Sequence, residues 1–422
     1  MDDPAKAKSK AGVLQWGLIK IILTLILLTA AFGTSSILLP PFLDGLGYHI
    51  SAIGVLVSVL NIAALLSRLP SGLFYNASRA ARLIRISLIL FGVTTALYPF
   101  AKDPLFLWPL RFVNGLFYGV ATTVNFAMYM DAIPPQVARH RALALYAGGL
   151  AAGHMVGNTI GGYTHDIFGM DNAFFITAFF SSAALLFTFR IQLHPQPPAK
   201  RPMGHRETKE DTQAAKTAGL SWLSRIRRFV PVFLDPLVVD MFMVAFFLNL
   251  FFSLAGTYLT LYALAVGLTL GHVGVIKGAL SLTNAVTRPF SGDLASRFGE
   301  DRISNIGLTV TTCLLMVIPF LSTLAPLVVL FVLMGFMRAG VLVSNTVKAA
   351  RVGEKSMSRG MASGLYNAAT DLGTIVGPIY GGLIASQVGL VPMFWISPVV
   401  GLGAYFLVQL IARRRTGVFP GS

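Results

Sequence analysis

Twelve long apolar runs, separated by short polar segments, make up most of this chain. They cover residues 18–39, 52–75, 83–101, 105–130, 142–164, 173–192, 238–264, 272–295, 303–322, 326–349, 360–385 and 391–412. At about 1.5 Å of rise per residue, each run is long enough to cross a hydrocarbon core of about 30 Å as an α-helix. The alternating strands of a transmembrane barrel do not occur in the pattern. The sequence therefore predicts an all-α integral membrane protein with twelve transmembrane helices.

The second six runs repeat the first six at a constant offset of 220 residues. Chance matches would fall mainly on Leu, Ala and Val, whereas the matches that keep this offset fall in clusters on less common residues. Arg68 and Gly72 shift onto Arg288 and Gly292, Asn125 shifts onto Asn345, and Gly153, Gly157 and Gly161 shift onto Gly373, Gly377 and Gly381. This pattern indicates a duplication. It predicts two pseudosymmetric six-helix bundles.

A polar segment joins the two repeats. Residues 193–218 are rich in Pro and in charges of both signs, which is typical of a flexible linker. Residues 220–230 place apolar side chains at helical spacing beside a basic face, as in a helix that lies on an anionic membrane surface, although an ordinary basic connector has the same composition. We expect a first bundle over 1–192, a cytoplasmic linker with an interfacial helix over 193–236, and a second bundle over 237–422.

Composition and charge support a membrane location. The chain is 55% hydrophobic and 12% charged, with a mean hydropathy of +0.71, more apolar surface than a soluble domain hides. Its formal net charge of +16 raises the question of nucleic acid, but among the 33 Lys and Arg only Lys102 falls in a predicted outer segment. The positive-inside rule explains this distribution, so we expect no nucleic-acid partner and two cytoplasmic termini. We expect a multi-pass protein of the cell membrane, specifically a bacterial inner membrane, and the single Cys313 excludes an intramolecular disulfide.

Charged residues inside the predicted spans are candidates for function, because a charge at mid-bilayer is costly unless it is paired or solvated. Asp371 and Arg338 fall about 11 and 12 residues into their runs, at a similar estimated depth. We expect them to meet, with Asp371 binding a proton and Arg338 holding it ionised or contacting an anionic substrate. A permanent structural ion pair is the alternative. His154 lies at similar depth, either as a proton relay or as a polar side chain satisfied by Asn or by backbone.

Further polar residues fall at other depths in the spans. Arg111 and Lys277 lie about two turns from the outer ends of their runs, where Lys277 could also extend to the outer surface. Asn125 and Asn345 hold equivalent places in the two repeats, which suits either a pseudosymmetric cavity or equal packing. The excess of Arg111, Lys277 and Arg338 over Asp371 favours a small substrate that is anionic or amphipathic.

The loop after the eighth run reads Arg288-Pro-Phe-Ser-Gly292-Asp293-Leu-Ala-Ser296-Arg297-Phe-Gly299, and the loop after the second run reads Arg68-Leu-Pro-Ser-Gly72-Leu-Phe-Tyr-Asn76. Together with the six-plus-six arrangement and the basic central segment, these two loops resemble those of the major facilitator superfamily of secondary transporters. The resemblance covers essentially the whole chain. In that family an acid in the loop locks a cytoplasmic gate, whereas here Asn76 and Ser296 stand at the acid's places; a neutral side chain can still cap a helix end. The resemblance therefore implies gating roles for Arg68, Gly72, Asn76, Arg288, Gly292, Asp293, Arg297 and Gly299.

Two glycine-rich helices extend the resemblance. The run that begins Gly153-His-Met-Val is similar to the family's antiporter pattern, with Asn158 in place of its Pro, and this favours export. Glycines at four-residue spacing make a smooth face on which a neighbouring helix can pack or slide. We assign this packing role, with gating as the alternative, to Gly153, Gly157, Gly161, Gly373, Gly377, Pro378 and Gly381.

The resemblance implies a secondary active transporter that works by alternating access, and we expect proton-coupled export. Proton-coupled uptake of an anionic metabolite and a non-transporting receptor remain as alternatives. The sequence carries no His-Glu-x-x-His, Gly-x-Ser-x-Gly or Walker pattern, which argues against an enzyme and against ATP as an energy source. We expect a monomer whose partners are a small-molecule substrate, protons and the lipid bilayer, with no cofactor and no metal.

Overall fold

The computed structural model describes residues 4–133, 139–189, 235–355 and 359–416. These residues form twelve α-helices and two short 3₁₀ turns. The first six helices are α1 (Pro4–Gly45), α2 (Ile50–Leu73), α3 (Ala77–Ala96), α4 (Pro104–Ala132), α5 (Arg139–Phe168) and α6 (Met170–Thr188). The second six are α9 (Pro236–Ala265), α10 (Leu270–Phe298), α11 (Glu300–Val317), α12 (Leu324–Lys355), α13 (Arg359–Val388) and α14 (Leu390–Thr416). The predicted interfacial helix over 220–230 lies outside the described residues.

The helices confirm the predicted all-α fold with twelve spans. Most extend beyond their apolar runs, because polar residues continue the helical backbone past the hydrocarbon core. Within the described chain, eight helices are long and apolar enough to cross a membrane. The other four are α4, α5, α10 and α13. Three of these four form contacts between the two halves of the chain: α5 packs on α10, and α13 packs on α2.

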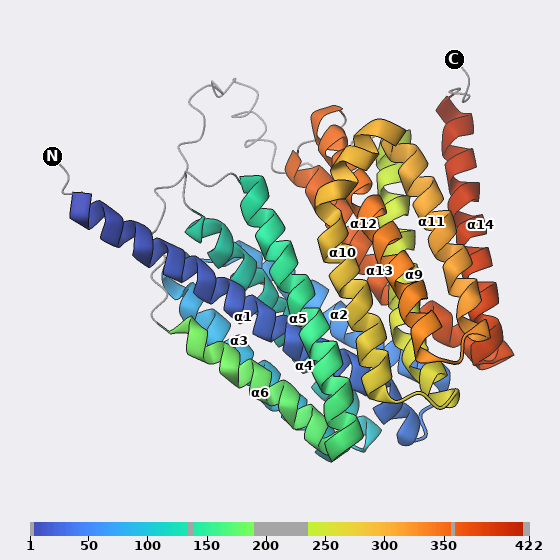
Figure 1. Ribbon diagram of the computed structural model, residues 1–422, viewed down its shortest axis with the longest axis horizontal. Helices are drawn as coiled ribbons and strands as arrows, with labels where there is room; N and C mark the ends of the chain where they lie inside the picture. The colour runs from blue at the N-terminus through green and yellow to red at the C-terminus, as the bar shows by residue number, and fades with distance from the viewer. Residues whose placement is uncertain (1–3, 134–138, 190–234, 356–358, 417–422) are drawn as a thin grey trace, which may run out of the picture.

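The helices are arranged as two bundles, with α1 to α6 in one and α9 to α14 in the other (Figure 1). The start of α1 and the end of α14 lie at the same end of the molecule, which we call the terminal face, and the other end is the opposite face. The turns that follow α1 and α9 at the opposite face have the same shape, because Gly47 and Gly267 both adopt a positive φ, at 79° and 85°. The duplication is therefore visible in the backbone as well as in the sequence.

Glycine packing inside each bundle follows the same duplication. A Cβ at Gly157 would overlap the carbonyl of Ala30 on α1, and a Cβ at Gly377 would overlap the carbonyl of Leu250 on α9, the position 220 residues later. The hydroxyl of Thr34 donates to the carbonyl of Gly157 at 2.9 Å. Close contact of this kind needs residues without side chains. The predicted packing role of this glycine face is thus an interaction of α5 with α1 and of α13 with α9.

The two bundles meet along two seams, α2 against α13 and α5 against α10. Each seam has a glycine packed against a carbonyl of the other bundle: Gly54 against Pro378, and Gly274 against Asn158. These two contacts are also equivalent by the 220-residue shift. Nearer the opposite face, Gly162 packs against Leu270 and Gly382 against Ile50 in the same manner. The opposite face is therefore closed by backbone-to-backbone contact between the bundles.

Candidate functional site

A cavity of about 240 Å³ lies between the two bundles. Its lining comes from both halves and combines small polar groups, cationic groups and a few apolar side chains. The residues are Phe32, Ser36, Leu39, Val57, Asn61, Arg111, His154, Asn158, Asn249, Phe252, Ser253, Gly256, Thr257, Lys277, Leu280, Ser281, Arg338 and Thr374. A cavity at the interface of two halves, with few polar groups that converge on it, is the usual setting of a small-molecule site. We call it the central cavity.

Two predicted site residues from the second bundle bring basic side chains into the central cavity. Lys277 is only 9% exposed, and its Nζ hydrogen-bonds to the hydroxyl of Thr260 at 2.9 Å. This burial excludes the alternative in which Lys277 extends to the outer surface. Arg338 places its guanidinium over the ring of Phe252, 4.4 Å from the ring centre, in a cation–π contact.

Arg111 also lines the cavity, but its guanidinium is satisfied by its own bundle. Its Nε donates to the carbonyl of Leu56, and its Nη1 lies at hydrogen-bond distance from the hydroxyl of Tyr98, both at 3.3 Å. The side chain is 3% exposed. These contacts join α4 to α2 and to the turn after α3, so Arg111 acts mainly as a structural cation.

His154 lines the cavity from α5. Its Nδ1 lies 2.7 Å from the carbonyl of Leu150, and its ring meets Phe32 edge to face. The backbone partner agrees with the interpretation of a satisfied histidine. The same contact holds the orientation of the ring beside the cavity.

Asp371 is paired with Arg68 and not with Arg338, which corrects the expected pair. The Asp371 Oδ1 lies 2.5 Å from Nη1 of Arg68, so the ion pair joins α13 of one bundle to α2 of the other. Among the described ion pairs none links Asp371 to Arg338. Asp371 lies about one helical turn closer to the terminal face than Thr374, which lines the cavity. The carboxylate therefore belongs to a seam at the edge of the cavity.

The twin asparagines lie away from the cavity and pack the bundles in the same way. The amide of Asn125 donates to the carbonyl of Ile21 at 3.2 Å, and the amide of Asn345 donates to the carbonyl of Met241 at 3.1 Å. Both the donors and the acceptors are related by the 220-residue shift. Of the two alternatives for these residues, equal packing is the one that the structure supports.

Apart from Arg68 and Arg288, the predicted gate residues lie at the terminal face, where Gly72 and Gly292 have open surroundings. A Cβ at Gly72 would meet only Thr123, at 4.0 Å, and a Cβ at Gly292 would meet nothing within 4 Å. Asn76 caps α3, as its oxygen accepts from the amide of Ser78 at 3.0 Å. Three others, Asp293, Arg297 and Gly299, are exposed near the end of α10.

Arg288, also predicted as a gate residue, lies deeper in α10. Its Nε is buried and makes no hydrogen bond with the described residues, and the same is true of Nε of Arg338. The two guanidinium groups are close enough for their charges to act on each other. The structure thus brings Arg288 together with a cavity residue, which the loop pattern did not predict.

Asp166 at the opposite face was not among the predicted site residues. It lies on α5 beyond the predicted span 142–164, and its Oδ2 accepts from the amide of Gly271 at 2.8 Å, at the start of α10. Burial raises the pKa of this carboxyl, but hydrogen bonds from the Thr269 hydroxyl and the Gly271 amide and the nearby His165 outweigh that effect, so the pKa lies below its ordinary value. Asp166 therefore closes the α5–α10 seam with a charge at a helix N-terminus.

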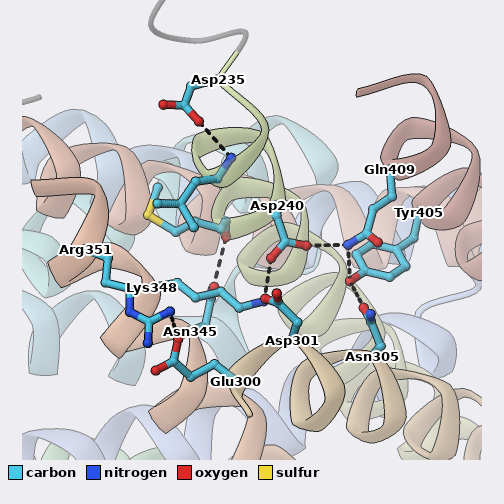
Figure 2. A network of polar contacts seen from close by, with 12 residues as sticks. Asp235, Asp240, Glu300, Asp301, Asn305, Asn345, Lys348, Arg351, Tyr405 and Gln409 are labelled. Atoms are coloured by element: carbon cyan, nitrogen blue, oxygen red, sulfur yellow. Dashed lines mark hydrogen bonds and ion pairs between the residues drawn. The ribbon is translucent and has the colours of Figure 1, made fainter. Parts of the chain in front are cut away.

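A second unpredicted group is a polar cluster within the second bundle, close to the start of α9 (Figure 2). Lys348 of α12 is 1% exposed and pairs with Asp240 of α9 and, at 2.8 Å, with Asp301 of α11. Asp240 also accepts from Gln409 of α14. The charges lie near helix ends, where they look like ordinary surface residues in the sequence. Because all the partners belong to one bundle, the cluster ties its helices together.

Comparison with known proteins identifies the family. The family model of the Major Facilitator Superfamily matches residues 21–325 and 278–419. Similar curated proteins include an uncharacterized MFS-type transporter, MJ1560, of Methanocaldococcus jannaschii, 21% identical over 85% of this chain and 89% of that protein. The multi-drug resistance efflux pump PmrA homolog of Lactococcus lactis is 23% identical over 79% of this chain and 76% of its own length. The multidrug resistance protein MdtG of Salmonella paratyphi B is 25% identical over 81% of this chain and 78% of its own length.

Solved structures share the fold over nearly the whole chain. The nucleoside transporter NupG superposes with a TM-score of 0.72 at 15% identity, covering 96% of this chain and 100% of its own. A bacterial homolog of the human lysosomal transporter Spinster gives a TM-score of 0.71 at 14% identity, covering 95% of this chain and 97% of its own. At these identities the likeness concerns the fold.

Proposed function

The chain belongs to the Major Facilitator Superfamily, and on that premise we propose that this multi-pass membrane transporter exports a small molecule in exchange for protons. The observation that carries the proposal is the ion pair between Arg68 and Asp371, which joins the two bundles beside the central cavity. A carboxylate at this place can link a change of its own charge to the contact between the halves.

The arrangement of contacts supports alternating access. The bundles are in backbone contact near the opposite face, while Gly72 and Gly292 at the terminal face have open surroundings. The positive-inside distribution of Lys and Arg supports a cytoplasmic location of the terminal face. In this orientation the molecule is in an inward-facing state, and the outward-facing state requires the seams to part and the terminal face to close.

Asp371 is the group that we assign to proton coupling. In the inward-facing state the carboxylate of Asp371 is held by the guanidinium of Arg68, so its counter-charge comes from the other bundle. When α2 and α13 move apart this ion pair breaks, and in the proposed cycle a proton takes the place of Arg68 on the carboxylate and is released toward the cytoplasm when the pair forms again. This alternation moves protons inward as the substrate moves outward.

Two lines of support favour export. The glycine pattern of α5 resembles the family's antiporter pattern, and the names of two relatives describe efflux or multidrug resistance. One observation favours the other candidate, proton-coupled uptake of an anionic metabolite: Lys277 and Arg338 line the cavity, and no carboxylate is among its described lining residues. The direction of proton-driven flux separates the two.

Inside-out membrane vesicles with an acidified interior test the direction. Two permanently charged probes, benzenesulfonate and benzyltrimethylammonium, cover both signs of substrate charge. Export by antiport predicts that at least one probe accumulates in the vesicles, and that a protonophore abolishes the accumulation. Symport predicts proton-driven loss of probe from preloaded vesicles, and that result would replace export by uptake. Vesicles without the protein serve as the control.

A further inference from the structure

The two seams between the bundles differ in charge although the fold repeats. Arg68 on α2 and Arg288 on α10 are equivalent by the 220-residue shift, but among the ion pairs of the described residues Arg68 has a carboxylate partner and Arg288 has none. The position equivalent to Asp371 is Ala151, which carries no charge. The second seam therefore repeats the arginine of the first seam but does not repeat Asp371.

Arg288 has a second cation beside it. The guanidinium of Arg338 is near enough for the charge of Arg288 to act on it, and Nε of each side chain is buried without a hydrogen bond to the described residues. The residue equivalent to Arg338 in the first bundle is Tyr118, so this second charge is also absent from the repeat. Two neighbouring, half-buried guanidinium groups repel each other, and an anion between them would offset that repulsion and accept hydrogen bonds from both.

Lys277 extends the positive charge deeper into the central cavity. It lies on the same helix as Arg288, three turns closer to the opposite face, and both Lys277 and Arg338 line the cavity. Its described hydrogen bond goes to the neutral hydroxyl of Thr260. We call Lys277, Arg288 and Arg338 the cation cluster.

Apolar side chains lie beside the cation cluster. Phe252 carries the guanidinium of Arg338 on its ring face, and Phe32, Leu39, Val57 and Leu280 also line the cavity. The volume of about 240 Å³ is just below the range of about 300 to 1,000 Å³ that is usual for ligand pockets, and it suits a compact ligand. Charge, apolar surface and size thus point to one kind of molecule.

We propose that the central cavity binds a small organic anion with an apolar, ring-sized body. The anionic head accepts hydrogen bonds from Arg338 and Lys277, with Arg288 adding attraction from the side of the terminal face. The body packs against Phe252 and Phe32. This proposal rests on the transport function proposed above, since it names the class of molecule that the transporter carries.

The charge of the cavity lining should favour anionic ligands over cationic and neutral ones. A cationic ligand would meet the charges of Lys277 and Arg338 with no carboxylate among the described lining residues to offset them. A neutral ligand would leave the same cations unpaired. Discrimination should therefore follow the charge of the ligand more than its shape.

Binding to the purified protein in detergent, by isothermal titration calorimetry at pH 7, tests this class without any need for flux. The probes are benzenesulfonate, benzenesulfonamide and benzyltrimethylammonium, which share a ring and carry charges of −1, 0 and +1. We expect benzenesulfonate to bind at least about tenfold more tightly than either of the others, because only the anionic probe offers a charged acceptor to Arg338 and Lys277.

Arg338→Gln and Lys277→Met should each weaken benzenesulfonate binding by about tenfold to a hundredfold. Arg338→Lys, which keeps the charge and loses the planar fork, should retain part of the affinity. The matched control is Arg85→Gln, because Arg85 also lies over a phenylalanine ring, that of Phe189, outside the cavity. Circular dichroism and gel filtration establish that each variant is folded. If Lys277→Met does not fold, the comparison of Arg338→Lys with the wild type still tests the site.

The outcomes separate the ligand class from the transport function. Equal or tighter binding of the cation or of the neutral probe overturns the anion proposal, even if vesicles show proton-driven export. Binding of benzenesulfonate that the Arg338 and Lys277 variants leave unchanged overturns the site. Specific binding of benzenesulfonate without proton-driven flux of any probe keeps the ligand class and overturns the proposed export.

Discussion

Asp166 is the residue through which pH should act on the closed opposite face. Its carboxylate belongs to the first bundle and accepts a hydrogen bond from the start of α10 in the second. The charged or titratable groups around it are His165, at 3.2 Å, and His272, whose ring takes part in the cap of the same helix. A carboxylate at a helix N-terminus stabilises the contact only while it is ionised.

We predict that acid weakens this seam. Because the pKa of Asp166 lies below its ordinary value of 3.8, the stabilisation is fully present above that value and is lost as the pH falls through the lowered pKa. Asp166→Asn should remove the charge at every pH and shift the ratio of closed to open opposite face by about twofold to fivefold, as a helix-end charge contributes about 0.3 to 1 kcal/mol.

Spin labels at Asn172 and Gln387, one on each bundle at the opposite face, report this change as a distance distribution in a Cys313→Ser background. The wild type should show the same distance distribution at every pH from 5 to 8. Asp166→Asn should show a larger fraction of long distances than the wild type. If the two proteins give the same distribution at pH 7, Asp166 does not hold the seam.

At the scale of the helix, glycine positions that look alike in the sequence have different surroundings. Gly157 and Gly148 both lie on α5, but a Cβ at Gly157 would overlap the backbone of Ala30, while a Cβ at Gly148 would meet nothing within 4 Å. The sequence marks both as helical glycines. The difference arises from which side of α5 packs on α1.

We predict opposite effects of alanine at these two glycines. Gly157→Ala should destabilise the protein by about 1 to 3 kcal/mol, because α1 and α5 must separate to admit a methyl group. Gly148→Ala should stabilise it by about 0.5 to 1 kcal/mol through helix propensity alone. The measurement is the midpoint of thermal unfolding of each variant in the same detergent. Equal midpoints would mean that α1 and α5 leave room for a methyl group at position 157.

The glycines at the terminal face should affect movement more than stability. A leucine side chain at position 72 or 292 would extend into open space in this state, so Gly72→Leu and Gly292→Leu should fold normally. The larger side chain at each position should, however, obstruct closure of the terminal face. We predict slower transport for each and the slowest for the pair, with Gly72→Ala as a milder control. Wild-type flux in proteoliposomes that contain the double variant would exclude a gating role.

The helices and their repeat could be predicted from sequence for a clear physical reason. An apolar run of spanning length has few other structures available in a bilayer, and the 220-residue offset was strong enough to assign equivalent helices. The contacts that Gly54 and Gly274 make with the other bundle are related by the same offset. What repeats in the sequence thus repeats in the fold.

The partners of buried charges could not be predicted in the same way. Counting residues from helix ends placed Asp371 and Arg338 at similar depth, but it gave no direction around the helix axis, and Asp371 faces α2 instead of α12. Lys348 lies at a helix end that looks like surface in the sequence, although it is 1% exposed. The cavity charge was predictable, since Lys277 and Arg338 stood out inside apolar runs, whereas contacts across the seams required the packed structure.

At the scale of the whole molecule, the two bundles differ in their chemistry while sharing one fold. The second bundle carries the cation cluster, the Lys348 cluster and Asp371, and the equivalent positions of Arg338, Lys348 and Asp371 in the first bundle are Tyr118, Met128 and Ala151. We infer that the second bundle supplies the cations that bind the head of the substrate and the carboxylate that carries the proton, and that the first bundle supplies Arg68 as the ion-pair partner of Asp371. The coupling of proton to substrate then depends on movement between the bundles.

Proton-driven flux in proteoliposomes with Asp371→Asn tests this account most directly. The variant cannot change charge at position 371, so it should lose accumulation of probe under an imposed pH gradient, while exchange of probe across the membrane without a gradient continues. The control is Asp171→Asn, which changes an exposed carboxylate on α6 and should behave as the wild type. If Asp371→Asn still accumulates probe at the wild-type rate under the gradient, Asp371 is only a structural partner of Arg68 and the proton is carried elsewhere.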